Sequence, residues 1–267
     1  MKILASVYSK KNIDKNKLLV TIDTETKKYK FHKLNIIQKD YLGCFGLCYS
    51  GDNLIFSIYR NSLCEDIVMH KLFSSNYFIY QCNISKGVNS IVSVFPGKIY
   101  MNSFGSNTIN YINFNSETIK IKNEDIYFKI NWNLNINSLY SYRSRWYASL
   151  IDKNNIGVVA ELNNDRFVYS YIKNPISVFF NENHRMCFLE KDLGLFHCGD
   201  NLWYVGNNPT SVIEDIYSGG YWIASRINNI YGLQFVDYEG NDKNFIPFEN
   251  ENEYFISNML EARGIFK

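Results

Sequence analysis

Six small or polar residues stand at the same place after a repeated segment, and they are the first candidates for binding chemistry. The segment has a Ser or Asn column, with Leu in one copy, and three places beyond it stand Ser9, Arg60, Gly105, Asp152, Asp192 and Asn228. One cation, two carboxylates and an amide at equivalent places could converge on one polar ligand. Each could instead be a turn residue, because Asp, Asn, Gly and Ser are favoured in turns for local reasons. We predict ligand binding by Arg60, Asp152, Asp192 and Asn228, with the turn alternative open.

Two aromatic residues in other connections extend this candidate site. Trp132 lies between Asn131 and Asn133 in the longest loop, and Tyr41 follows Asp40. An exposed indole ring flanked by amides suits stacking against a sugar or a peptide. The alternative for Trp132 is that the ring packs under its own loop.

Glu214 and Asp215 are the candidates for catalysis. They follow a small residue in an apolar segment near the end of the chain, and alternation along a strand directs one of the two inward. A carboxylate in a narrow channel could act as a general base or hold a divalent cation. It could equally accept backbone hydrogen bonds.

Other chemistries find no matching pattern. The histidines, His32, His70, His184 and His197, are scattered through the repeats, so neither a metal site nor a Ser-His-Asp triad is expected. We predict no metal and no cofactor. The formal net charge of +2 is too balanced to indicate a nucleic-acid partner.

The six cysteines show no CxxC spacing and lie mostly in apolar runs, as Cys44 and Cys48 do. This is typical of free, buried thiols in a reducing compartment. The first residues become polar too soon for a signal peptide, and no run of 18 apolar residues offers a membrane span. We therefore expect a cytoplasmic protein.

The repeat has two columns that keep the same order. In the first column, apolar residues surround a Ser or Asn, at positions 6, 57, 102, 149, 189 (Leu) and 225. In the second, a small residue precedes an apolar strand, at Gly46, Ser90, Ser138, Ser177, Ser211 and Ser257. Two independent columns that agree over six copies indicate a real internal repeat.

Further strand-like runs separated by turn residues lie between the columns, such as residues 108–114 and 118–121 in the third repeat. Four strands in about 45 residues is the pattern of a β-propeller blade. We predict an all-β, single-domain, six-bladed propeller over residues 1–267. Residues 253–260 would join the N-terminal strands, which leaves no open edge between the first and last blades.

A family resemblance supports this fold. Residues 221–225 (YWIAS), followed by residues 231–237 (YGLQFVD), are similar to blades of the broad regulator-type and NHL-type propeller superfamily. The likeness implies the architecture and names no single function, since propellers host binding, scaffolding and catalysis.

The sequence predicts a non-catalytic recognition module that binds a carbohydrate-like ligand or a protein segment on the loop face around the channel mouth. The alternative is an enzyme, a hydrolase or lyase acting on a sugar-like or lactone-like substrate, with a divalent cation in the channel. A scaffold that binds partners at its blade edges is the third possibility.

Overall fold

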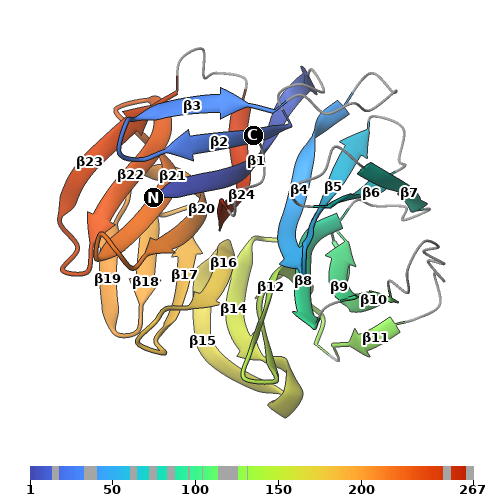
Figure 1. Ribbon diagram of the computed structural model, residues 1–267. Helices are drawn as coiled ribbons and strands as arrows, with labels where there is room; N and C mark the ends of the chain where they lie inside the picture. The colour runs from blue at the N-terminus through green and yellow to red at the C-terminus, as the bar shows by residue number, and fades with distance from the viewer. Residues whose placement is uncertain are drawn as a thin grey trace.

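The computed structural model describes residues 1–13, 18–32, 41–60, 65–71, 77–82, 88–95, 97–103, 105–113, 126–130, 132–248 and 254–262. Within these residues the secondary structure is β-strand apart from one short 3-10 turn, η2 (Leu162–Asn164). The all-β prediction is confirmed. Figure 1 shows the sheets following one another around a common centre. In the described part of the chain no helix is long and apolar enough to cross a membrane.

Four sheets contain four antiparallel strands each, in chain order. The first is β8 (Val88–Phe95), β9 (Lys98–Ser103), β10 (Thr108–Asn113) and β11 (Ile126–Lys129). The second is β12 (Asn135–Tyr142), β13 (Arg145–Ile151), β14 (Ile156–Glu161) and β15 (Arg166–Lys173). The third is β16 (Pro175–Phe180), β17 (Met186–Glu190), β18 (Leu195–Cys198) and β19 (Asn201–Tyr204). The fourth is β20 (Asn207–Asp215), β21 (Gly220–Ile227), β22 (Ile230–Asp237) and β23 (Asp242–Pro247).

The fifth sheet has eight strands and joins the two ends of the chain. Its strands are β1 (Lys2–Ile13), β2 (Leu19–Asp23), β3 (Lys28–Phe31), β4 (Tyr41–Ser50), β5 (Asn53–Arg60), β6 (Glu65–Lys71), β7 (Tyr77–Cys82) and β24 (Tyr254–Glu261). β24 pairs with β1 from Ile3 opposite Glu261 to Ser9 opposite Tyr254. Farther along, β1 pairs with β4 at Tyr8 and Gly43. Of the predicted strands, residues 118–121 lie outside the described residues. β11 lies shortly before Trp132, where the sequence predicts a long loop.

An extra residue interrupts the strand pairing near the predicted small-residue column in β4, β8, β12, β16 and β24, and two extra residues do so in β20. In β4 the extra residue is Gly46, since Phe45 and Leu47 face consecutive residues of β5. The register shifts likewise at Asn89 of β8, Asn137 of β12 and Ser257 of β24. Such a bulge bends its strand and redirects side chains, so a small or turn-forming residue suits the position.

The first column, in which a Ser or Asn recurs among apolar residues, supplies buried polar groups to these bulges. Ser57 donates from Oγ to the Phe45 carbonyl at 2.8 Å, and Ser149 Oγ lies 2.8 Å from Ser138 Oγ. Ser6 Oγ lies 2.7 Å from Ser257 Oγ across 251 residues of sequence. A buried hydroxyl group is costly unless it is paired, which explains why a polar column recurs within apolar strands.

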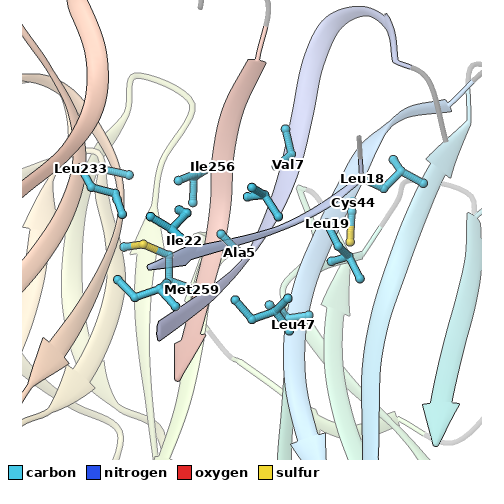
Figure 2. Packing of buried hydrophobic residues seen from close by; sticks show 14 of the residues in the cluster. Ala5, Val7, Leu18, Leu19, Ile22, Cys44, Leu47, Leu233, Ile256 and Met259 are labelled. Carbon is cyan, nitrogen blue, oxygen red and sulfur yellow. The ribbon is translucent and has the colours of Figure 1, made fainter. Parts of the chain in front are cut away.

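The largest hydrophobic cluster lies between the eight-stranded sheet and β20–β23. Figure 2 shows Ala5, Ile22, Ile256 and Met259 packed with Leu233 of β22. All of these side chains are buried. Each fully buried aliphatic side chain contributes roughly 1.5–3 kcal/mol, so this cluster holds the joined chain ends against the fourth sheet.

We expect Gly46→Ala to destabilise the protein more than Gly105→Ala. Both glycines have positive φ, +53° and +65°. A Cβ at Gly46 would lie 2.7 Å from Ile91 Cγ1 of β8, whereas one at Gly105 meets nothing within 4 Å. Backbone strain alone predicts a loss of about 1–2 kcal/mol for Gly105→Ala, and the clash adds about 1–3 kcal/mol for Gly46→Ala. Urea unfolding of both variants measures the difference, and equal losses would contradict the close approach of β4 and β8.

A buried histidine makes stability depend on pH. His32 is buried, and its Nε2 lies 2.5 Å from Thr21 Oγ1. Burial, and then the positive charges of Lys30 and His70, lower the pKa of His32 from 6.5 to about 4. Between these two values the unfolded chain binds the proton and the folded chain does not, so stability decreases as the pH is lowered.

We therefore expect the free energy of unfolding to decrease from pH 6.5 towards pH 4, by up to about 3 kcal/mol from this residue. His32→Gln should flatten that part of the profile, which chemical denaturation at a series of pH values would show. Superimposable slopes for the variant and the unmodified protein would count against a neutral, buried His32.

Candidate functional site

A central cavity of about 340 Å³ is lined by side chains from all five sheets. Its walls are formed by β4, β8, β12, β16, β20 and β24, with further contributions from β1 and from the turn after β17. The lining residues among those described are Tyr8, Phe45, Asn89, Ser90, Asn137, Ser138, Ile176, Ser177, Lys191, Thr210, Ser257 and Asn258. Most of them belong to the bulges, so the repeated small-residue column forms the wall of this cavity.

A chain of side-chain amides crosses one side of the cavity. Asn89 Nδ2 donates to the Asn137 carbonyl at 2.5 Å, and Asn137 Nδ2 donates to Asn174 Oδ1 at 3.1 Å and to the Pro175 carbonyl at 2.8 Å. Asn174 Nδ2 in turn donates to Asp192 Oδ1 at 3.0 Å. These contacts connect β8, β12, β16 and the turn after β17, and they fix the amides that face the cavity.

Serine hydroxyls join neighbouring bulges directly. Ser90 Oγ accepts the backbone N–H of Leu139 at 3.1 Å, and Ser138 Oγ accepts that of Val178 at 3.2 Å. Ser257 Oγ donates to the Cys44 carbonyl at 2.6 Å. The contacts of Ser90 and Ser138 hold adjacent sheets together, and that of Ser257 connects β24 with β4 within the eight-stranded sheet. Together they give the cavity a polar wall of fixed geometry.

Two aromatic side chains, Tyr8 and Phe45, also line the cavity. The rings of Tyr8 and Phe45 lie 5.2 Å apart between centroids, and Phe255 lies 5.4 Å from Tyr8. Burial raises the pKa of Tyr8, so its hydroxyl stays protonated at neutral pH. An aromatic surface in the same cavity as amides and hydroxyls can bind a ligand that has both an apolar face and hydrogen-bonding groups.

Lys191 is the one charged side chain among the described residues that line the cavity. It follows β17 in the turn that also holds Asp192, and its backbone N–H donates to the Asn174 carbonyl at 3.2 Å. Lys191 is half-buried, and a lysine in a wall of hydroxyls and amides favours a ligand with a carboxylate or another acceptor-rich group.

The predicted ligand-binding residues lie at different places around this cavity. Asp192 joins the amide chain described above. Asp152 accepts the N–H groups of Asn154 and Ile156 at 2.8 and 2.9 Å and so organises its own turn. Asn228 is an exposed turn residue with φ of +50°. The side chains of Arg60 and Tyr41 lie outside the described part of the chain.

Trp132 is half-buried and lies against the second sheet. Its ring centroid lies 4.5 Å from that of Phe167 on β15, the last strand of the second sheet. It also packs against the cluster that contains Trp146 and Leu162. Trp132 is not among the described residues that line the cavity.

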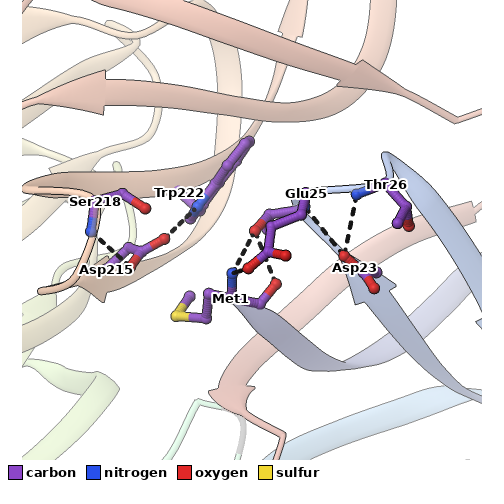
Figure 3. Close-up of polar contacts among 8 residues, drawn as sticks. Met1, Asp23, Glu25, Thr26, Asp215, Ser218 and Trp222 are labelled. Atoms are coloured by element: carbon purple, nitrogen blue, oxygen red, sulfur yellow. Dashed lines mark hydrogen bonds and ion pairs between the residues drawn. The ribbon is translucent and has the colours of Figure 1, made fainter.

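Glu214 and Asp215 lie at the end of β20, beyond Thr210, which lines the cavity. Figure 3 shows Asp215 between Ser218 and Trp222. Asp215 is fully buried and accepts the Ser218 N–H and the Trp222 indole N–H, each at 3.1 Å. Glu214 accepts the Tyr238 hydroxyl at 2.9 Å and the Glu182 N–H at 3.0 Å. Burial raises the pKa of Glu214, an effect that the Tyr238 hydrogen bond opposes.

Among the described residues, no three His, Cys, Asp or Glu side chains are grouped so as to hold a metal ion.

Lys191 and the amides of Asn137 and Asn174 are candidate binding groups that the sequence did not indicate. The predicted ligand-binding residues Arg60, Asp152, Asp192 and Asn228 stand three places beyond the first column, whereas Lys191 stands two places beyond it. One signal could have found Asn137: an Asn precedes the column Ser at both Asn89 and Asn137, where each is the extra residue of its bulge.

Comparison with known proteins identifies the fold and no narrower group. No family model matches the chain, and no curated protein matches it. Among solved structures, a chain of the nidogen/laminin complex superposes with a TM-score of 0.67 at 10% identity, over 97% of both chains. A putative 6-phosphogluconolactonase from Bacteroides fragilis gives 0.58 at 9% identity, over 98% of both chains.

The β-propeller domain of Cps50 (Swd1) from Myceliophthora thermophila gives a TM-score of 0.52 at 9% identity, over 85% of this chain and 79% of that one. At these identities the likeness concerns the fold alone. The Cps50 structure is a β-propeller domain, and the predicted resemblance to β-propellers is confirmed at the level of the fold.

Proposed function

We propose that the chain is one domain of six blades and that the cavity is the mouth of its central channel. The four-stranded sheets are four of these blades. The eight-stranded sheet comprises two more, β24-β1-β2-β3 and β4-β5-β6-β7, joined where β1 pairs with β4. The pairing of β24 with β1 supports closure of the ring between the last and first blades.

We infer that the protein is a non-catalytic recognition module that binds its ligand in the central cavity. The observation that carries this inference is the composition of the wall: amides and hydroxyls fixed by hydrogen bonds, two aromatic rings, and one lysine. Such a wall offers directional hydrogen bonds and one ion pair, which specify a ligand with little need for large apolar burial.

The ligand that fits best is a protein segment whose acidic side chain reaches Lys191. A propeller of similar fold is known in the nidogen/laminin complex, which supports a protein partner. A carbohydrate-like ligand would use the same hydroxyls, amides and aromatic rings. In this proposal Arg60, Asp152, Asp192, Asn228, Trp132 and Tyr41 belong to the loop face that the partner covers outside the cavity.

The test is binding to an array of acidic peptides and neutral oligosaccharides, with two matched lysine variants. Lys191→Met should weaken binding of an acidic peptide about tenfold or more, because an ion pair in a half-buried site is lost. Lys98→Met removes the same charge from the exposed first residue of β9, at the opposite end of that strand from Gly105, and should leave the affinity unchanged. Equal effects of the two variants, or retention of oligosaccharides alone, would contradict a protein segment as the ligand.

The second candidate is the hydrolase or lyase that uses Glu214 or Asp215. The raised pKa of Glu214 favours it, since a general acid must hold its proton near neutral pH. Against it, both carboxylates are bound to neighbouring groups at the far end of β20 from Thr210.

We expect the unmodified protein to turn over no lactone or glycoside, with or without added divalent cations. We also expect Asp215→Asn to lower the free energy of unfolding by about 1–3 kcal/mol, because an amide oxygen cannot replace both carboxylate acceptors. Turnover that Glu214→Gln abolishes, in a protein of unchanged stability, would establish the enzyme instead.

A further inference from the structure

Two cysteines stand opposite each other on adjacent strands of the third sheet. Cys187 of β17 and Cys198 of β18 are register partners. In the next pair, Gly199 donates its N–H to the Met186 carbonyl at 2.9 Å. Hydrogen-bonded and non-hydrogen-bonded pairs alternate along an antiparallel ladder, so the cysteines form a non-hydrogen-bonded pair, with Cα atoms about 4.5 Å apart. A disulfide can bridge that separation.

The surroundings of the two thiols differ. Asn181 donates from Nδ2 to the Tyr221 hydroxyl oxygen at 2.8 Å, which leaves the Tyr221 proton free for Cys198 Sγ at 3.3 Å. Asn181 Nδ2 is also 3.5 Å from Cys198 Sγ. Cys187 Sγ instead donates to the Arg185 carbonyl at 3.5 Å. Hydrogen-bond donors therefore surround Cys198, whereas Cys187 is paired with an acceptor.

Charge reinforces this difference. The neighbouring Cys187 thiol, and then the Tyr221 hydroxyl, lower the pKa of the Cys198 thiol against the opposing effect of burial. The same contact with Cys198, and then burial, raise the pKa of Cys187. The thiolate is the nucleophile in thiol chemistry, so Cys198 is the attacking group and Cys187 the resolving group.

We propose that Cys187 and Cys198 form a reversible modification site, at which a peroxide oxidises the thiol pair to a disulfide. The Cys198 thiolate attacks one peroxide oxygen, the O–O bond breaks, and a sulfenic acid forms as hydroxide leaves and takes up a proton. The Cys187 sulfur then attacks the sulfenic sulfur, the S–O bond breaks, and the second oxygen leaves as water with the Cys187 proton. The two thiols lose two electrons and two protons, and peroxide is reduced to two waters.

Access is provided by the turn between β18 and β19. Cys198 is only 3% exposed, but it is the last residue of β18, directly before Gly199 and the exposed Asp200. Peroxide is small, and β19 is the last strand of its sheet, so a local opening of this turn admits it. A small thiol can reduce the disulfide by the same route.

The test is mild peroxide treatment of the folded, unmodified protein, followed by alkylation of free thiols and peptide mapping. We expect a mass about 2 Da lower and a disulfide between the peptides of Cys187 and Cys198, reversed by dithiothreitol. Cys187→Ser should stop at a Cys198 sulfenic acid that dimedone traps. Full alkylation of both cysteines in the treated protein, or a disulfide that forms equally fast in urea, would overturn the proposal.

Tyr221→Phe tests the assignment of the attacking thiol. Loss of the hydroxyl should slow disulfide formation about tenfold near neutral pH and shift the pH dependence of Cys198 alkylation to higher pH. Tyr238→Phe is the matched control, because it removes a hydroxyl from the neighbouring ring without touching Cys198. Identical pH profiles for Tyr221→Phe and the unmodified protein would overturn the role of Cys198.

Discussion

Hydrogen bonds at the strand bulges hold the sheets around the central cavity. Each bulge exposes backbone and hydroxyl groups that a regular strand would keep in its own ladder. Ser90 and Ser138 use them to accept N–H groups from the next sheet, and Gly46 lets β8 approach β4 where no side chain fits. The polar wall of the cavity is therefore a consequence of how neighbouring sheets are joined.

The same constraint connects the two ends of the chain. Ser257 is the extra residue of β24, and it contacts Ser6 of β1 and the Cys44 carbonyl of β4. This one hydroxyl links three strands that are far apart in sequence. Apolar packing of Ile256 and Met259 beneath it supplies most of the stabilisation, while the hydroxyl contacts set the register.

The repeat made the fold predictable, because bulge residues and buried hydroxyls recur at fixed spacing in strands that are otherwise apolar. The site was harder to predict, since turn chemistry and binding chemistry favour the same residue types. Asp152 follows its strand as predicted, yet it organises a turn, whereas Lys191, one position before the predicted Asp192, reaches the cavity. The charge of Asp215 suggested a catalytic role. Its hydrogen bond with Trp222, which gives it a structural role, is visible only in the fold. The spacing of the columns does not define the direction of a side chain well enough to distinguish a turn residue from a residue that faces the cavity.

The central claim is that hydroxyl contacts at the bulges hold the strands around the cavity in place. A double-mutant cycle on Ser6 and Ser257, which connect the two ends of the chain, tests it most directly. Urea unfolding of Ser6→Ala, Ser257→Ala and the double variant gives the coupling free energy. We predict a coupling of about 1 kcal/mol, because two directly bonded buried hydroxyls are not independent. A coupling near zero would contradict the account, since it would mean that β24 and β1 do not meet at this bulge.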